Sequence, residues 1–170
     1  VTGLTKAAGD YTVYVLSSDT IYAPEDSTGL FRGMTELISV DARNLNMSRV
    51  DNTTYFFRDC TKLQKVDTTG WDTSNITNMQ GFFYKCNALT EITGIKNWDV
   101  SNVTSLYATF YNMHALTELD LSGWDTGSVT KMDYVIANNN NLETINLTGW
   151  DWSNVETSTW AFRINPKLKN

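Results

Sequence analysis

The sequence repeats itself about every 26 residues. Leucines recur along most of the chain at intervals of 26 or 27 residues, at Leu37, Leu63, Leu89, Leu116, Leu142 and Leu168. In the same frame, a tryptophan followed directly by an aspartate recurs at Trp71, Trp98, Trp124 and Trp150. Leucines at fixed offsets within a period of about 20 to 29 residues are typical of a leucine-rich-repeat solenoid, in which each repeat forms one coil stacked on the last. The repeat therefore predicts the architecture and moves the functional question from active sites to surfaces.

Each repeat contains a segment that alternates apolar and polar residues, as in 63–68. This alternation predicts a short strand, and coils in register would join the strands into one parallel sheet. The segment after the Trp-Asp pair is rich in Thr, Ser and Asn and is expected to be a turn, in which the aspartate accepts backbone N–H bonds. The stretch 78–84 could add one or two helical turns on the opposite face. The predicted fold class is an α/β-type repeat solenoid of right-handed leucine-rich-repeat coils with one parallel β-sheet face.

Equivalent positions in successive repeats form apolar columns, as stacked coils need in order to exclude water. One column is mostly aromatic, at Phe31, Phe57, Phe83, Phe110, Ile136 and Phe162. The tryptophans form another, which either packs a corner of the coil, the interpretation we favour, or serves as a platform for sugars or a protein partner. The extra residue of the single 27-residue step falls between Ile92 and Trp98, where Gly94 indicates a loop that can absorb it.

The two ends of the chain depart from the repeat. The solenoid is expected to span 27–170, as half a coil followed by about five coils. Residues 1–26 are predicted to form an N-terminal β-cap, in which Tyr11–Leu16 and Thr20–Ala23 pair as a hairpin. The repeat runs to the end without a divergent polar coil. Either 164–166 forms a cap or the chain is a piece of a longer array, and we favour the second.

Composition limits the classes of partner. A hydrophobic content of 41% with 12% aromatic residues excludes a disordered chain. A net charge of −6 without a basic cluster argues against nucleic acid and anionic membranes as partners. The chain has no apolar stretch near 18 residues, so no membrane insertion is predicted. Val1 begins no signal peptide, so the targeting segment of an exported protein would lie outside this sequence. A monomer is expected.

The two cysteines, Cys60 and Cys86, lie one period apart and therefore in the same place of adjacent coils. Stacked strands bring such residues within reach of a disulfide. The same place is filled by Met34, Met113 and Asn139 in other repeats, which indicates a packing position. We therefore favour buried free thiols over a disulfide.

The repeat resembles that of a known family. Residues 71–79, Trp-Asp-Thr-Ser-Asn-Ile-Thr-Asn-Met, followed by Phe-Phe-Tyr-x-Cys-x-x-Leu at 82–89, resemble the repeat of BspA-type leucine-rich-repeat surface proteins, and so does 23–31. The resemblance covers about residues 23–168 and weakens at 127–128 and 138–141, where this chain departs from the pattern. It implies a secreted protein of Gram-positive bacteria or mycoplasmas, attached to the wall or membrane and associated with adhesion to host or matrix molecules. Ligands differ among family members, so the resemblance names none.

The outward positions of the predicted strands are candidates for binding, because repeat proteins often bind extended partners on this face. They carry acids and one amide, at Asp67, Glu91, Glu118, Asp120 and Asn146, and a basic partner would suit them. The alternative, a solvated face without a partner, is the interpretation we favour from the sequence alone. Trp152 and Trp160 lie off the tryptophan column and are further candidates for contact.

Catalysis and metal binding have little support. His114 is the only histidine, and no nucleophile–base pattern or phosphate-binding glycine loop accompanies it, so no catalytic residue and no cofactor are predicted. The aspartates that follow the tryptophans would lie about 5 Å apart, where they could share a calcium ion. The glycine pattern of calcium-binding repeats is absent, which favours turn capping and no metal.

The predicted function is therefore a non-catalytic, extracellular binding or adhesion module of a bacterial cell surface or cell wall. Its partner would be a host or matrix protein or glycoprotein. The alternatives are a structural spacer that holds another domain away from the wall, or, less favoured, a carbohydrate-active enzyme.

Overall fold

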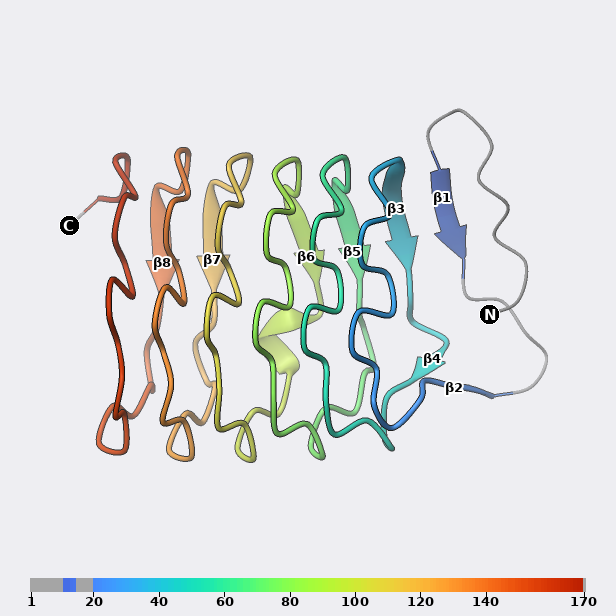
Figure 1. The fold of residues 1–170 in the computed structure, drawn as a ribbon, viewed down its shortest axis with the longest axis horizontal. Helices are drawn as coiled ribbons and strands as arrows, with labels where there is room; N and C mark the ends of the chain where they lie inside the picture. Colours follow the sequence, from blue (N-terminus) through green and yellow to red (C-terminus); the bar gives the residue numbers. More distant parts are fainter. Residues whose placement is uncertain (1–10, 15–19, 170) are drawn as a thin grey trace.

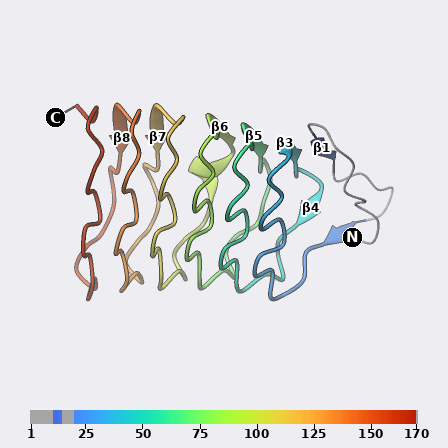
Figure 2. The same ribbon diagram turned by 45° about the horizontal axis from the view of Figure 1, so that its top comes forward.

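The structure is a computed structural model that describes residues 11–14 and 20–169. The chain winds into a parallel-strand β-solenoid of about five turns, whose coils stand side by side in one row from β1 to beyond β8 (Figure 1). Figure 2 shows the same row from a second angle. The predicted stack of coils is therefore present, whereas the right-handed leucine-rich-repeat form of each coil stays a prediction.

The strands are short and parallel. Four of them form one sheet in the order β1 (Tyr11–Tyr14), β3 (Leu37–Asp41), β5 (Lys65–Asp67) and β6 (Glu91–Thr93). β7 (Glu118–Asp120) pairs with β8 (Thr144–Asn146), and β2 (Ile21–Tyr22) pairs with β4 (Leu45–Asn46). The register follows the repeat, since Val66 lies opposite both Val40 and Ile92. The predicted parallel strands are confirmed, but the sheet is divided between β6 and β7.

A second side of the solenoid holds the coils together without regular strands. Single parallel bridges join every coil to the next, at Asp26, Asn52, Asn78, Ser105, Lys131 and Thr157. Beside them, Tyr55 N–H donates to the Gln80 carbonyl and Phe57 N–H donates to the Phe82 carbonyl, each at 2.8 Å. Alternate backbone N–H groups thus donate to carbonyls of the next coil. They cannot then donate to the carbonyl four residues earlier in their own chain, as an α-helix requires.

The one or two helical turns that the sequence allowed at 78–84 are therefore not formed: Asn78 is a bridge residue and 80–84 are turns. Within the described residues the single helical element is the 3₁₀ helix η1 (Ile95–Asn97), so the fold is a β-solenoid and not of α/β type. No helix in the described ranges is long and apolar enough to cross a membrane.

The tryptophan column lies in the core. Consecutive indole rings from Trp71 to Trp150 stack with centroids 5.8, 6.1 and 6.2 Å apart. Each Nε1–H donates to an oxygen of the preceding coil, at 2.8, 3.1, 3.0 and 3.1 Å. The predicted phenylalanine column is also buried from Phe31 to Ile136, with Phe83 stacked on Phe57 at 5.6 Å and on Phe110 at 6.0 Å, whereas Phe162 on the last coil is half-buried. The packing interpretation of the tryptophans is confirmed.

Both cysteines are free and buried, as favoured from the sequence. The Cys60 thiol donates to the Phe31 carbonyl at 3.0 Å, and the Cys86 thiol donates to the Phe57 carbonyl at 3.2 Å. Burial raises the pKa of Cys60 to about 12, and it raises the pKa of Cys86 well above the ordinary thiol value. Both side chains therefore remain neutral and serve as packing groups.

The N-terminal hairpin is wrong for the strands that the structure describes. β1 pairs with β3 and β2 pairs with β4, both in the parallel sense. Tyr11 lies opposite Leu37, and Ile21 lies opposite Leu45, so this segment follows the path of the next coil and packs Val13 against the shared core. Residues 1–10 and 15–19 lie outside the described residues. The capping role and the boundary at residue 27 stay predictions.

Candidate binding surfaces

The sheet is interrupted where the repeat takes its 27-residue step. Thr93 lies opposite Asp67 in the β5–β6 register. Ile95 takes the place that Thr68 has one coil earlier, because each supplies the oxygen that accepts the bond from the next indole. Gly94 lies between these two pairs of equivalent residues and has no counterpart in the earlier coil, so it is the inserted residue. Its φ of 91° is left-handed, so glycine absorbs the extra residue at little conformational cost, as the sequence predicted.

The backbone hydrogen bonds that pair neighbouring strands of the row elsewhere are missing between β6 and β7. Thr90 N–H donates to the Gln64 carbonyl at 2.9 Å, and Glu143 N–H donates to the Thr117 carbonyl at 2.8 Å. Among the described residues, the equivalent bond from Thr117 to Thr90 is not formed. Both ribbon views show β6 and β7 further apart than the other neighbouring strands of the row (Figures 1 and 2). The edges of β6 and β7 that face each other are therefore open.

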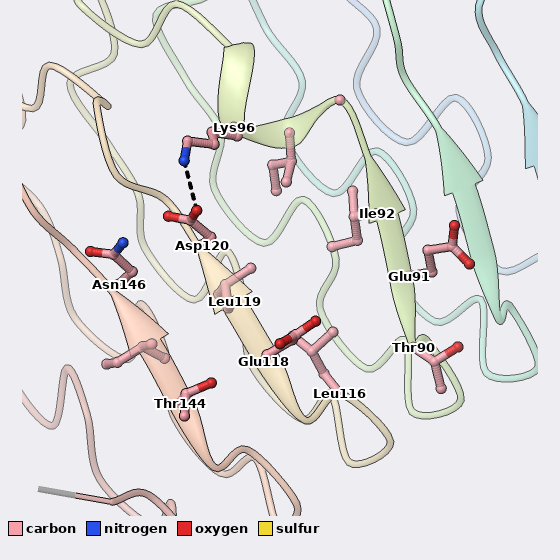
Figure 3. Close-up of a pocket in the computed structure, with 13 residues that line it drawn as sticks. Thr90, Glu91, Ile92, Lys96, Leu116, Glu118, Leu119, Asp120, Thr144 and Asn146 are labelled. Atoms are coloured by element: carbon pink, nitrogen blue, oxygen red, sulfur yellow. Dashed lines mark hydrogen bonds and ion pairs between the residues drawn. The ribbon is translucent and has the colours of Figure 1, made fainter.

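A cavity of about 510 Å³ lies at this gap between β6 and β7 (Figure 3). Its apolar lining consists of Ile92, Ile95, Leu116, Leu119 and Ile145. Its polar lining includes Thr90, Glu91, Lys96, Glu118, Asp120, Thr144 and Asn146. Ile92 is partly exposed, whereas Val66, its equivalent one coil earlier, is buried. The gap thus gives solvent partial access to Ile92, whereas Leu116, Leu119 and Ile95 remain buried in the lining.

The charged groups around the cavity are mostly acidic. Lys96 Nζ contacts Asp120 Oδ2 at 2.8 Å across the gap (Figure 3). This bond, together with hydrogen bonds from Ser122, lowers the pKa of Asp120 to about 2. Glu91 pairs with Lys65 at 2.9 Å, which lowers the pKa of Glu91. The carboxylate of Glu118 has no cationic partner among the described residues. With three carboxylates and one ammonium in the lining, the cavity favours a cationic ligand.

The structure brings together four of the residues singled out from the sequence. Glu91, Glu118, Asp120 and Asn146 all line the cavity. Asp67 does not line it: its carboxylate accepts a bond from Thr69 N–H at 3.0 Å and lies 3.4 Å from Arg43 Nε. The strand-face candidates thus divide into a group around the gap and one residue outside it.

The two exposed tryptophans lie on the last coil, away from the cavity lining. Trp152 is 41% exposed and packs against Trp150 and Phe162, with ring centroids at 5.5 and 5.9 Å. Trp160 is 53% exposed and carries the Arg163 guanidinium 4.2 Å from its ring centroid. Their predicted role in binding stays a prediction.

Trp160 belongs to a continuous row that sequence reasoning missed. Arg58 lies 4.5 Å from the ring of Tyr55 and 5.0 Å from that of Tyr84. From there the rings follow one another through successive coils, with centroids 5.1, 5.9 and 5.4 Å apart. We call this the aromatic–cation row; its members are Arg32, Tyr55, Arg58, Tyr84, Tyr111, Tyr134, Trp160 and Arg163.

Three of the rings in this row stand on left-handed backbone. Tyr55, Tyr134 and Trp160 have φ values of 58°, 56° and 54°, whereas Gly29 and Gly81 occupy the equivalent position in other coils. A bulky residue in this conformation costs of order 1–3 kcal/mol. Because Tyr, Trp and Arg are also the residues that dominate protein interfaces, the row is a second candidate contact surface.

The aspartates of the Trp-Asp pairs cap turns, as predicted. Each accepts the backbone N–H two residues further on, at 3.2, 2.9, 3.1 and 2.8 Å for Asp72, Asp99, Asp125 and Asp151. In residues 11–14 and 20–169, no group of three or more His, Cys, Asp or Glu side chains is placed to hold a metal ion.

The model of one protein family matches the chain twice, at residues 24–94 and 87–170. The family is described as "Mycoplasma protein of unknown function, DUF285". Searches among curated proteins and among solved structures found no match. The two matches together cover most of the solenoid, including β6, β7 and the cavity between them.

Proposed function

The chain belongs to this DUF285 family of unknown function, and we propose that it is a non-catalytic binding module of a bacterial surface protein. It presents the cavity between β6 and β7 to a host or matrix protein or glycoprotein and binds a basic part of that partner. The observation that carries this proposal is the opening of the sheet at the cavity, beside the carboxylate of Glu118, which has no cationic partner among the described residues.

The composition of the cavity supports binding. Binding pockets are commonly about 300–1,000 Å³ in volume and combine an apolar lining with a few placed polar groups. This cavity has both properties, and its lining lies on strands fixed by a stacked tryptophan core. A rigid scaffold loses little conformational entropy on binding, which favours affinity.

The state of the carboxylates supports a role without catalysis. A carboxyl group that acts as a general acid at neutral pH needs a raised pKa. The pKa of Asp120 is instead lowered by Lys96, and that of Asp99 is lowered by its bonds to Ser101. These groups are ionised at neutral pH and serve as acceptors in the rim and in the turns.

The proposed location at the cell surface or wall is supported by the resemblance of the repeat to BspA-type leucine-rich-repeat proteins. The same resemblance supports a leucine-rich-repeat form of the coil. An adhesive role fits a stack of coils that displays one exposed acidic face.

Surface plasmon resonance against mucin, fibronectin, fibrinogen and collagen tests the proposal at physiological salt. The informative variant is Glu118→Lys, and its control is Glu156→Lys, which reverses the charge of another exposed glutamate outside the cavity lining. A saturable ligand should lose at least tenfold in affinity with Glu118→Lys and little with Glu156→Lys. Equal affinities for the two variants would contradict binding at the cavity.

A structural spacer is the second candidate. It is favoured by the unbroken bridges from Asp26 to Thr157 and by the continuous tryptophan stack, both of which stiffen the row of coils. A spacer should bind nothing on the panel, and charge reversal at Glu118 should leave adhesion of the parent cell unchanged.

A further inference from the structure

The backbone of β6 presents unused hydrogen-bonding groups to the gap. In a parallel strand, the N–H and C=O groups of alternate residues point to opposite neighbours. Glu91 N–H donates to the Gln64 carbonyl at 3.2 Å, and the Thr93 carbonyl accepts from Thr68 N–H at 2.9 Å, so both residues bond toward β5. Ile92 lies between them. Its N–H and C=O therefore point into the gap, where no strand of the described chain pairs with them.

The same alternation applies to β7. The Thr117 carbonyl and the Leu121 N–H both bond to the coil of β8, at 2.8 and 2.9 Å. The N–H and C=O groups of the intervening residues Glu118 and Asp120 point the other way, toward β6. The gap therefore has two open strand edges that face each other, and not one.

We infer that the occupant of this gap is an extended polypeptide segment that enters between β6 and β7 as an added strand. This inference rests on the proposed function and specifies which part of the partner binds, namely an extended stretch of polypeptide. An open edge is a template for strand addition, a common mode of peptide recognition. A strand inserted here would bond on both sides and restore one sheet from β1 to β8, in the place where the ribbon views show the widest separation (Figures 1 and 2).

The side chains around the gap define the sequence of the segment. Successive residues of a strand point to opposite faces, at about 3.3 Å per residue. Inward side chains of the segment would meet Ile92, Leu116 and Leu119, and outward ones would meet the carboxylates of Glu118 and Asp120 (Figure 3). The segment is thus expected to alternate apolar and basic residues. Because β6 and β7 have three residues each, about five to seven residues would cover them.

The test is a comparison of two peptides by isothermal titration calorimetry with the whole chain. The first is acetyl-Lys-Val-Lys-Val-Lys-Val-Lys-amide, which carries the expected pattern. The second is identical except for N-methyl groups on its three valines, which remove the N–H donors that point to one neighbouring strand. Added-strand binding predicts at least a tenfold weaker affinity for the methylated peptide. Equal affinities would show attraction by charge alone and would overturn the inference, as would failure of both peptides to bind.

Two protein variants locate the site. Glu118→Gln removes the carboxylate charge at nearly constant side-chain size and should weaken binding of the unmethylated peptide several-fold, whereas Glu156→Gln should leave the affinity unchanged. Deletion of Gly94 restores the 26-residue step and is expected to close the gap, so a deletion variant that folds, as judged by circular dichroism, should not bind. A folded deletion variant with wild-type affinity would overturn the inference, and the comparison of the two peptides decides the matter if that variant does not fold.

The failure of this inference and the failure of the proposed function are distinguishable. A macromolecular ligand whose affinity depends on Glu118, together with equal binding of both peptides, would preserve the binding module and exclude the added strand. Tighter binding of the unmethylated peptide, together with its loss in Glu118→Gln, would support both.

Discussion

Gly94→Ala tests how closely the inserted residue of the 27-residue step approaches the backbone of the neighbouring coil. Gly94 has a φ of 91°, and an alanine in the left-handed region costs about 1–2 kcal/mol. A Cβ at this position would also lie 2.8 Å from Thr69 N and 2.9 Å from the carbonyl carbon of Thr68. Both atoms belong to the backbone of the neighbouring coil, so the coils must separate, and forced overpacking costs about 1–3 kcal/mol more. The expected total is about 2–5 kcal/mol of unfolding free energy.

Gly123→Ala is the matched control. Gly123 has nearly the same φ, 88°, but no atom of the described residues lies within 4 Å of an added Cβ. Its expected loss is therefore the conformational part alone, about 1–2 kcal/mol.

Guanidinium unfolding followed by tryptophan fluorescence measures both losses, and thermal unfolding should show the difference as about 2–4 °C per kcal/mol for a chain of this size. Equal losses for Gly94→Ala and Gly123→Ala would refute the close approach of the two coils at Gly94.

Three further predictions concern the core, the rim and the thiols. Phe110→Ala should cost about 3–5 kcal/mol, because Phe110 is fully buried in a packed column; a loss below about 1 kcal/mol in denaturant unfolding would place it outside the core. The pKa of Asp120, about 2, is lower than its ordinary value of 3.8, so the stabilisation from its bonds is complete above about pH 4 and is lost as the pH falls toward 2. An NMR titration of Lys96→Met should show this pKa rising toward 3.8, and an unchanged pKa would exclude the ion pair. Cys60 and Cys86 should react with Ellman's reagent at pH 8 only after unfolding, because both are buried with raised pKa values, and fast reaction of the native protein would contradict their burial.

The features that repeat could be predicted from the sequence. The parallel strands, the buried tryptophans, the aspartate caps and the free thiols each depend on a contact that recurs once per coil. A regular spacing in the sequence is therefore enough to predict them. The hairpin expected from Tyr11–Leu16 was wrong because strand propensity does not specify the partner strand. β1 lies against β3, where stacking on the next coil packs the half-buried Val13 against the shared core.

The features that interrupt the repeat were only partly predictable. The 27-residue step and Gly94 indicated a loop. The cavity, however, arises because backbone hydrogen bonds do not form between β6 and β7, and the residue types in these strands do not indicate that such bonds are missing. The aromatic–cation row was missed for a different reason. Its members belong to two columns of the repeat, and the row is continuous only because contacts cross between the columns, at Arg58 with Tyr55 and at Tyr111 with Tyr134. Reading down one column at a time does not reveal such crossings.

The most direct test of the open gap is amide hydrogen exchange at Glu118, measured by NMR with and without the alternating lysine–valine peptide. Glu91 and Thr144 hold the equivalent place in the neighbouring coils, and their N–H groups donate at 3.2 and 3.3 Å to the preceding coil. We expect the Glu118 amide to exchange at least tenfold faster than these two in the free protein, and to slow by at least tenfold when the peptide is saturating. Protection of Glu118 equal to that of Thr144 in the free protein would contradict the divided sheet, and an unchanged Glu118 rate with bound peptide would contradict the added strand.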